Sequence, residues 1–172
     1  MKLKLLINKE EIKNKVKELA EKINKDYKEK EPILIGILNG CFVFMADLVR
    51  ELKIPVEIDF VKIRSYAGTE TTGKIEMKLD IERDIRNKDV IIIEDIVDTG
   101  LTLNYLVKYL KRKGAKSIKI CALLDKPKRR RVDIKIDYLG FKIPNLFVVG
   151  YGLDVDERFR ELPEIYYIEQ EQ

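Results

Sequence analysis

The chain has 172 residues, of which 45% are hydrophobic and 37% are charged, and its 34 basic side chains nearly balance 30 acidic ones. The net charge of +4 gives no reason to expect a surface dedicated to nucleic acid. The sequence contains no histidine, which excludes Ser-His-Asp and Cys-His catalysis and histidine-bound zinc. Any acid or base catalysis is therefore expected to use carboxylates, lysine, tyrosine or cysteine, with help from a hard metal ion.

Cysteine usage and hydropathy indicate where the protein works. Cys41 and Cys121 lie far apart in apolar segments and form no CxxC pair, which is typical of a reducing cytoplasm. The apolar run at the N-terminus is too short for a signal peptide, and no stretch approaches the ~18 apolar residues that span a bilayer. We expect a cytoplasmic protein without membrane insertion, folded as a single domain over residues 1–172.

The first half of the chain alternates between helical and strand patterns. Asn8 with Glu11 three residues later predicts a helix start, and apolar residues then recur at helical spacing. A continuous apolar run then ends at Asn39-Gly40, which is typical of a buried strand followed by a tight turn. The expected elements are a helix over 9–29, a strand over 33–38, a helix over 42–52, a strand over 56–60 and a polar mobile loop over 65–74.

The second half continues the alternation of strands and helices. The expected elements are a strand over 90–93, a helix with apolar positions over 103–110 that ends at Gly114, and four strands over 118–124, 134–139, 147–149 and 165–168. Strands that alternate with helices favour an α/β fold, in which helices flank a central and mainly parallel sheet.

An acidic and hydroxyl-rich segment follows the strand predicted over 90–93. In an open parallel sheet, ligands bind beyond the carboxyl ends of the strands, which is where Glu94 and Asp95 stand. The turn over 98–102 leads into a helix, whose free backbone N–H groups and dipole bind anions. Two adjacent acids beside a phosphate would repel it unless they face sugar hydroxyls or a magnesium ion. A phosphorylated sugar satisfies both halves of the segment.

Simpler interpretations of this segment stay open at this point. Asp98 alone fits a helix N-cap, and Glu94 and Asp95 alone fit solvated loop acids. Other phosphate motifs fit less well, because the sequence has no GxxxxGK[ST] and no GxGxxG after a strand. A nucleoside-triphosphate P-loop and a dinucleotide-binding fingerprint are therefore not indicated.

The run from Ile91 to Thr102 resembles the phosphoribosyl pyrophosphate signature of the type I phosphoribosyltransferases. The surrounding segments resemble the hypoxanthine-guanine branch of that family over nearly the whole chain. The resemblance implies a small hood region and a mobile lid loop beside the central sheet. It also implies transfer of the phosphoribosyl group to N9 of hypoxanthine or guanine, giving IMP or GMP and pyrophosphate in purine salvage. Mg²⁺ would be the cofactor, and a homodimer or homotetramer the assembly.

On the phosphoribosyl side, the resemblance assigns roles residue by residue. Glu94 and Asp95 would hold the ribose hydroxyls and magnesium. Asp98 would also act as the general base near purine N7, which suits a chain without histidine. The 5′-phosphate would be bound by Asp98, Thr99, Gly100, Leu101 and Thr102.

The remaining roles implied by the resemblance concern pyrophosphate, purine and lid. Pyrophosphate would be bound by Leu38, Asn39, Gly40 and Arg160, with a non-proline cis peptide bond between Leu38 and Asn39. The purine would be bound by Lys126 at its 6-oxo group, Phe147 by stacking, Val148 through its backbone, and Asp154, which would also bind a second magnesium. The lid would start at Ser65 and Tyr66.

Several alternatives remain beside these roles. Relatives often have Lys or Arg at the position of Asn39, and Arg130 would face either pyrophosphate or a neighbouring subunit. Taken alone, the basic run over 126–131 fits a solvated loop or an RNA-binding patch, and Phe147 fits an ordinary core position. A regulator that kept the fold and binds RNA or DNA is the alternative function. A transferase for another base, such as xanthine or a pyrimidine, is a further one.

Overall fold

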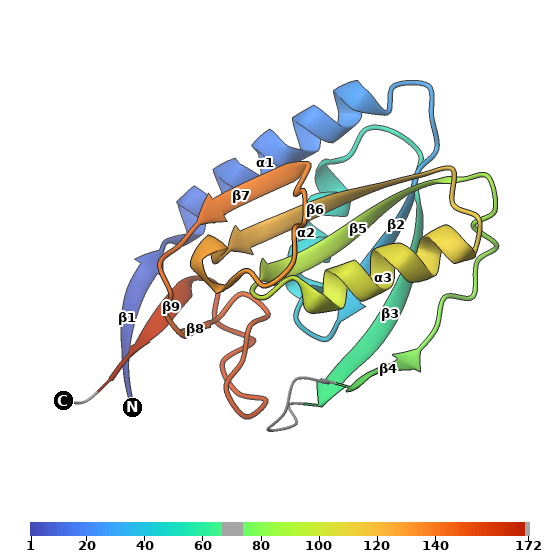
Figure 1. Cartoon of the computed structure of the whole chain (residues 1–172). Coiled ribbons are helices and arrows are strands. Elements are labelled where there is room, and N and C mark those ends of the chain that lie inside the picture. The colour runs from blue at the N-terminus through green and yellow to red at the C-terminus, as the bar shows by residue number, and fades with distance from the viewer. Residues whose placement is uncertain (67–73, 171–172) are drawn as a thin grey trace.

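The computed structural model describes residues 1–66 and 74–170, whose strands form two sheets (Figure 1). In chain order, the elements are β1 (Lys2–Ile7), α1 (Lys9–Asp26), β2 (Ile33–Leu38), α2 (Phe42–Glu51), β3 (Glu57–Tyr66), β4 (Lys74–Leu79), β5 (Asp89–Val97), α3 (Leu101–Arg112), β6 (Ser117–Asp125), the 3₁₀ helix η1 (Pro127–Arg129), β7 (Tyr138–Lys142), β8 (Val148–Val149) and β9 (Ile165–Glu169). The predicted α/β class is confirmed.

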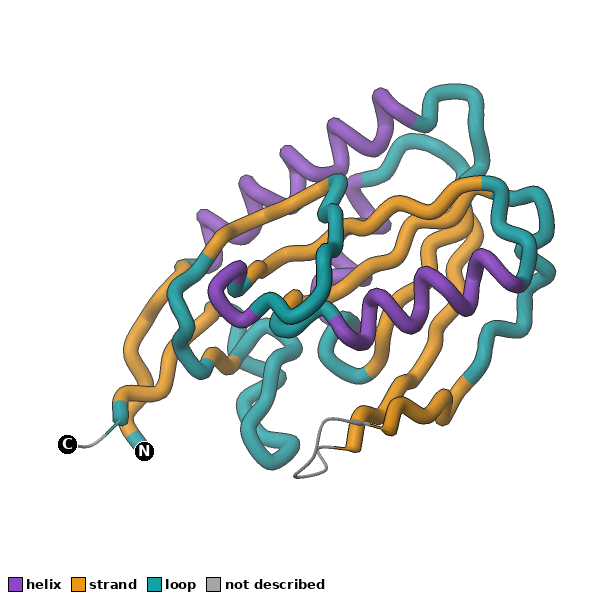
Figure 2. Tube along the Cα trace, viewed as in Figure 1, coloured by secondary structure: helices purple, strands orange, loops and turns teal. Residues whose placement is uncertain are grey.

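The larger sheet has six strands in the order β4-β3-β2-β5-β6-β7. All neighbouring strands run parallel except β3 and β4, so the expected mainly parallel sheet is confirmed. The helices α1 and α2 cover one face of the sheet and α3 covers the other, as the helix and strand colours of Figure 2 also show.

Strand β5 shows how the sequence builds both faces of the sheet. Successive side chains of a strand point to opposite faces. Accordingly, Ile91 and Ile93 pack into a core with α1 and α2, whereas Val90 and Ile92 pack into a second core with α3. All four side chains have no exposed surface. A strand covered on both faces needs a continuous apolar run, which is why this segment has no polar alternation.

Helix α1 begins where the sequence predicts and ends earlier. The Glu11 backbone N–H donates to Asn8 Oδ1 at 2.9 Å, and the Asn8 N–H donates to Glu11 Oε2 at 2.8 Å, so the predicted capping box is confirmed. The helix was predicted to continue to residue 29, but it ends at Asp26. Tyr27 is the C-cap, and Glu29 has a φ of +63°, which a right-handed helix does not allow.

Two predicted strands extend further than their apolar runs. Strand β5 continues through Glu94 and Asp95 to Val97, because its neighbour β6 pairs with it as far as Asp125. Strand β3 continues to Tyr66, because β4 pairs with it as an antiparallel partner. The first two residues of the mobile loop predicted over 65–74 therefore lie in β3, and its last residue, Lys74, lies in β4. Residues 67–73 lie outside the described part of the chain.

The strand predicted over 134–139 is shifted toward the C-terminus and forms β7. The cause is Asp137, whose Oδ2 accepts the backbone N–H of Ile120 at 2.8 Å, in place of a backbone carbonyl of a continuous strand. Ile134 and Ile136 pack against the α3 core from an irregular segment. The apolar alternation of these residues predicts their burial correctly, but it does not predict a paired strand.

The smaller sheet is antiparallel and has the order β1-β9-β8. It lies beside the end of the main sheet, with both chain termini at its outer end (Figure 1). Ile7, Val148 and Ile165 of this sheet belong to the same core as α1 and α2. This small sheet corresponds to the expected hood region. Its strand β1 was not predicted, because the short N-terminal run gave no signal for its partner at the other end of the chain.

The order of the strands fixes where a ligand site can form. The chain leaves β2 toward β3 on one side, and it leaves β5 toward β6 on the other, although β2 and β5 are neighbours. The loops after these two strands diverge, which opens a crevice at the carboxyl edge of the sheet. The residues after Leu38 and after Val97 therefore face one another across this crevice.

Leu106 tests the core on the α3 face, because its side chain has no exposed surface. Leu106→Ala is expected to lower the free energy of unfolding by about 2–5 kcal/mol, through lost burial and the cavity left behind. Urea unfolding followed by circular dichroism measures this change. The control is Lys108→Ala on the exposed side of the same helix, for which a change within about 0.5 kcal/mol is expected. Equal losses in both variants would contradict this packing.

Candidate active site

Three loops meet at the crevice, and two glycines allow their close approach. A Cβ atom on Gly40 would lie 1.9 Å from Asp95 Oδ2, so no side chain fits between the loop after β2 and the end of β5. A Cβ atom on Gly152 would lie 2.5 Å from the Gly40 carbonyl oxygen. The segment around Gly152 therefore packs directly on the loop that packs on Asp95. The structure brings together segments that lie more than fifty residues apart in sequence.

Glu94 and Asp95 form an acid pair near the end of the central strand. Glu94 is 8% exposed and Asp95 is half-buried, and both lie within β5, so the alternative of two solvated loop acids is wrong. Burial raises the pKa of Glu94 well above its usual range, and the neighbouring Asp95 carboxylate raises it further. Burial also raises the pKa of Asp95, although a hydrogen bond with Glu94 and the positive charge of Arg160 oppose this rise. The pair is an electrostatically costly arrangement that a cation or hydrogen-bond donors would relieve.

The turn after β5 forms an anion cradle at the start of α3. Gly100 is the N-cap of α3 with a φ of +84°, and no side chain caps the helix. The Thr99 hydroxyl oxygen accepts the backbone N–H of Leu101 at 3.3 Å. A cavity of about 220 Å³ lies over this turn, lined by residues 94–100 together with Ile37, Ile63, Thr102 and Leu103. An uncapped helix start that opens into a cavity suits a phosphate group.

Asp98 does not cap the helix, so the N-cap alternative is wrong. Its Oδ1 instead accepts a hydrogen bond from Arg129 Nε at 2.9 Å, in an ion pair whose side chains are 43% and 49% exposed. Lys126, three residues before Arg129, is 8% exposed, and burial lowers its pKa while the nearby Asp98 partly opposes that effect. The basic run therefore turns toward the site at Lys126 and Arg129, and the solvated-loop alternative is wrong for Lys126.

Phe147 and Val148 stand at the start of the hood strand β8. Phe147 is 54% exposed, so the alternative of an ordinary core position is wrong. The Val148 side chain is 5% exposed, and its residue pairs with Tyr167 of β9. An aromatic face open to solvent next to an ordered strand is suited to stacking on a planar ring.

Arg160 and Asp154 lie in the loop that follows β8. Arg160 Nη1 donates to the Gly152 carbonyl oxygen at 2.7 Å, and its Nη2 lies 3.4 Å from Asp154 Oδ1. Arg160 is close enough to Asp95 to lower the pKa of that carboxyl group. Arg160 therefore acts on the crevice through Asp95, although its side chain also lines the larger cavity beside it, and Asp154 is linked to the crevice through Arg160. Neither residue is the free surface charge that the sequence taken alone would allow.

The loop after β2 has the predicted backbone. The peptide bond between Leu38 and Asn39 is cis, and the Phe42 N–H donates to the Asn39 carbonyl oxygen at 3.2 Å. The Asn39 side chain is exposed. Farther along the same edge, Ser65 and Tyr66 end β3 and pair with Ile75 and Lys74 of β4.

The described residues contain no ready-made metal cage. Among them, no group of three or more His, Cys, Asp or Glu side chains is placed to hold a metal ion. Glu94, Asp95 and Asp154 therefore do not converge on one point in the way that a dedicated all-protein site requires. Adjacent carboxylates still fit Mg²⁺, which commonly takes one or two carboxylates and completes its shell with water and substrate oxygens.

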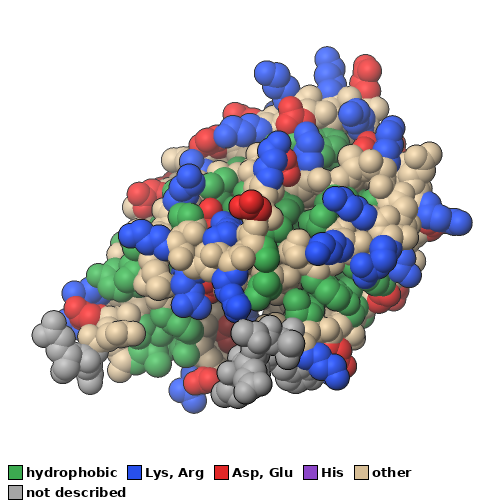
Figure 3. All heavy atoms as spheres, in the orientation of Figure 1, with side chains coloured by type: hydrophobic (Ala, Val, Ile, Leu, Met, Phe, Trp, Pro, Cys, Tyr) green, Lys and Arg blue, Asp and Glu red, His purple; other side chains and the backbone are tan. Residues whose placement is uncertain are grey.

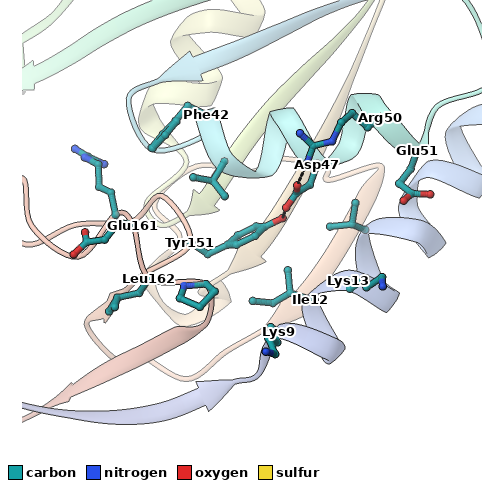
Figure 4. Close-up of a pocket in the computed structure, with 14 residues that line it drawn as sticks. Lys9, Ile12, Lys13, Phe42, Asp47, Arg50, Glu51, Tyr151, Glu161 and Leu162 are labelled. Carbon is teal, nitrogen blue, oxygen red and sulfur yellow. Dashed lines mark hydrogen bonds and ion pairs between the residues drawn. The ribbon is translucent and has the colours of Figure 1, made fainter.

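A larger cavity of about 700 Å³ lies beside the crevice, between α1, α2 and the C-terminal loop. Figure 4 shows Tyr151 reaching across it from the loop to α2, where its hydroxyl donates to Asp47, which also pairs with Arg50. The wall of this cavity is mainly apolar and includes Phe42, which is 45% exposed. The acid pair and the phosphate turn do not line this cavity, so it is not the centre of the chemistry.

Sequence reasoning missed several residues of the site, among them Ile37, Ile63 and Arg129. Ile37 and Ile63 line the cavity over the phosphate turn, and Arg129 pairs with Asp98. The two isoleucines lie in ordinary apolar strands, and only the strand order places them at the crevice.

On the face drawn in Figure 3, basic side chains are spread over several elements with acidic ones among them.

Comparisons with known proteins agree with this geometry. The profile of the phosphoribosyl transferase domain matches residues 6–156. The hypoxanthine-guanine phosphoribosyltransferase of Bacillus subtilis is 47% identical over 94% of this chain and 91% of its own length. That of Aquifex aeolicus is 46% identical over 98% of this chain and 96% of its own length. A crystal structure of a hypoxanthine-guanine phosphoribosyltransferase from Bacillus anthracis has a TM-score of 0.94 at 46% identity, covering 98% of this chain and 100% of that chain.

The chain belongs to the phosphoribosyl transferase family. Within that family, the hypoxanthine-guanine phosphoribosyltransferases named above match nearly its whole length, and the chain is a purine-salvage enzyme of this type. The alternative of a regulator that binds RNA or DNA finds no support in these comparisons. None of the helices in residues 1–66 and 74–170 has the length and hydropathy needed to cross a membrane.

The buried acid pair predicts a pH dependence of stability. Because the folded-state pKa of Glu94 is raised, its contribution to stability is fully present below the unfolded-state pKa and is lost as pH rises toward the folded-state value. Gln cannot ionise, so Glu94→Gln is expected to become increasingly stable relative to the parent protein between about pH 5 and about pH 8. Urea unfolding at several pH values in magnesium-free buffer measures the difference.

The control for this experiment is Glu21→Gln on the exposed side of α1, for which a constant difference is expected across the same range. If the parent protein loses no stability relative to Glu94→Gln as pH rises, the acid pair is not electrostatically strained.

Proposed function

We propose that the protein transfers the 5-phosphoribosyl group of phosphoribosyl pyrophosphate to N9 of hypoxanthine or guanine, giving IMP or GMP and pyrophosphate. The observation that carries this proposal is the shared crevice. An uncapped helix start and a buried acid pair line the same cavity, and Lys126 and Asp98 lie within electrostatic reach of one another beside it. A phosphorylated sugar that reacts with a purine needs these two halves together.

On the sugar side, the turn over 98–102 binds the 5′-phosphate. Its donors are the backbone N–H groups at the start of α3 and the hydroxyls of Thr99 and Thr102. Glu94 and Asp95 accept hydrogen bonds from the ribose 2′- and 3′-hydroxyls. The ribose hydroxyls thus supply the hydrogen-bond donors that compensate for the desolvation of the two carboxylates.

On the leaving-group side, the backbone over 38–40 and Arg160 bind pyrophosphate. The contact between Gly40 and Asp95 holds this backbone next to the sugar site. Arg160 contributes positive charge, and Asn39 contributes an exposed amide in place of the Lys or Arg of many relatives. Glu94, Asp95 and Asp154 would hold magnesium, which when bound neutralises charge on the pyrophosphate oxygens.

On the base side, Lys126 donates to the 6-oxo group of the purine. Lysine has donors and no acceptor, so it favours a 6-oxo group and disfavours the 6-amino group of adenine. The exposed ring of Phe147 stacks on the purine, and the Val148 backbone and Asp154 contact its edge. Ser65 and Tyr66 start the lid that excludes water from the reacting centre.

The reaction is a displacement at ribose C1′. The bond from C1′ to pyrophosphate breaks with its electron pair leaving on pyrophosphate, and the bond from C1′ to purine N9 forms. Asp98 accepts the proton that the purine loses at N7. Its Oδ1 is held by Arg129, and no hydrogen bond from the described residues reaches its Oδ2, which is the oxygen available to the base.

We propose further that residues 1–172 act as one domain in a cytoplasmic homodimer or homotetramer. Both cysteines are free and buried, and burial raises the pKa of each thiol, which suits a reducing compartment. The exposed Phe42 at the apolar cavity beside the site supports contact with a second copy. Light scattering of the purified protein decides this, and a monomer at all concentrations would contradict the proposal.

The activity is tested with phosphoribosyl pyrophosphate, magnesium and one base at a time from hypoxanthine, guanine, xanthine, adenine and uracil. Nucleotide formation is expected with hypoxanthine or guanine, and none is expected when EDTA replaces magnesium. Reaction with only adenine or uracil would contradict the role of Lys126. Undiminished turnover in EDTA would contradict the metal role of the carboxylates.

Asp98→Asn keeps the shape of the side chain but cannot accept a proton. It is expected to lower kcat/KM for hypoxanthine by about 100- to 10,000-fold, the usual contribution of a positioned base. Steady-state kinetics measure the loss, and Asp133→Asn at an exposed position of the next segment is the control. A loss below about fivefold in Asp98→Asn would show that the N7 proton has another acceptor.

A further inference from the structure

The loop that carries Lys126 is tied at both ends to the phosphate turn. The Lys126 N–H donates to the Val97 carbonyl oxygen at 2.9 Å, and the Arg131 N–H donates to the Thr99 carbonyl oxygen at 2.9 Å. The two segments belong to different halves of the proposed site, since one reads the base and the other holds the phosphoribosyl group. Their relative position is therefore set by contacts between them.

Arg130 supplies the side-chain contact between these segments. A Cβ atom on Gly100 would lie 3.2 Å from Arg130 Cδ, so the aliphatic stem of Arg130 lies against the glycine of the phosphate turn. Its Nη2 donates to Asp125 Oδ1, and Asp125 is the last residue of β6, directly before Lys126. Arg130 thus connects the turn to the root of the base-reading loop.

The pair of Arg130 and Asp125 is much less exposed than the pair of Arg129 and Asp98. The Arg130 and Asp125 side chains are 18% and 6% exposed, against 49% and 43% for the other pair. Arg130 Nη1 is also buried without a hydrogen-bond partner among the described residues. Since an unpaired buried donor is costly, surrounding contacts rather than hydrogen bonding alone hold the guanidinium in place. Removing either partner leaves an uncompensated buried charge.

We propose that Arg130, held by Asp125, is a positioning residue that sets the distance between Lys126 and the phosphate turn, and thereby helps to select 6-oxopurines. This inference rests on the proposed function. Purine selection requires Lys126 to meet the 6-oxo group while the phosphoribosyl group stays fixed in its cradle. The Arg130 side chain is hydrogen-bonded at its guanidinium and packed along its stem, so it holds the distance between the two segments with little freedom.

The test uses Arg130→Met, Arg130→Lys and Asp125→Asn, with Lys128→Met as the control in the same loop. Lys128 is exposed and forms no ion pair with the described residues. Arg130→Met is expected to lower kcat/KM for hypoxanthine by about 10- to 100-fold. It is also expected to narrow the preference for hypoxanthine over adenine by about tenfold. Arg130→Lys is expected to recover part of the lost kcat/KM and part of the lost preference for hypoxanthine. The double variant Asp125→Asn/Arg130→Met is expected to lose less kcat/KM than the product of the two single losses.

A purely structural pair would behave differently. It would lower the melting temperature while leaving the preference for hypoxanthine over adenine and both KM values within about twofold of the parent enzyme, and that result overturns the inference.

Hydrogen exchange separates failure of this inference from failure of the proposed function. Faster amide exchange over both 98–102 and 126–131 in Arg130→Met, but not in Lys128→Met, supports the coupling whether or not the parent protein turns over purines. If the parent protein makes no nucleotide, the proposed function fails on its own. Unchanged exchange in Arg130→Met overturns the coupling.

Discussion

The burial of two adjacent carboxyl groups at the end of the central strand is the constraint on which the rest of the site depends. Strand β5 must be apolar on both faces to sit inside the sheet, yet it also carries the buried Glu94 and the half-buried Asp95. Such a pair is costly without a partner. The surrounding loops provide the space and the charge that make it useful, and Arg160 is the first of these contributions.

The site is assembled at the one edge of the sheet where consecutive connections diverge. Secondary structure supplies rigid positions, such as the end of β6 at Asp125, and loops supply the chemistry. This division explains why the segments proposed to hold sugar, leaving group and base come from separate regions of the chain. It also explains why the larger cavity between α1 and α2 is not the one that contains the acid pair. Volume follows from how α1 and α2 pack, whereas reactivity follows from where the acids and the helix start meet.

The sequence indicated the elements well and their pairing less well. Apolar periodicity located α1, α2 and α3, and the capping box fixed the start of α1. Apolar periodicity could not predict β1, because its partner β9 is more than 150 residues away and pairing over such a distance leaves no local pattern. The turn over 98–102 was visible because its chemistry is contiguous. Arg129 was not distinguished from its basic neighbours, and the Asp125 partner of Arg130 was not expected, since only the fold decides which charges turn inward.

The stacking of Gly152 on Gly40 and of Gly40 on Asp95 leaves no volume for a side chain at either glycine. Changes in sequence can therefore alter the leaving-group side only at its margin, where the Asn39 side chain reaches solvent. The interior of this stack admits no gradual variation, because even one added methyl group displaces a carboxylate or a carbonyl. Attempts to redesign the enzyme for other phosphorylated donors thus meet a fixed backbone here, in front of which the exposed Asn39 side chain can be changed.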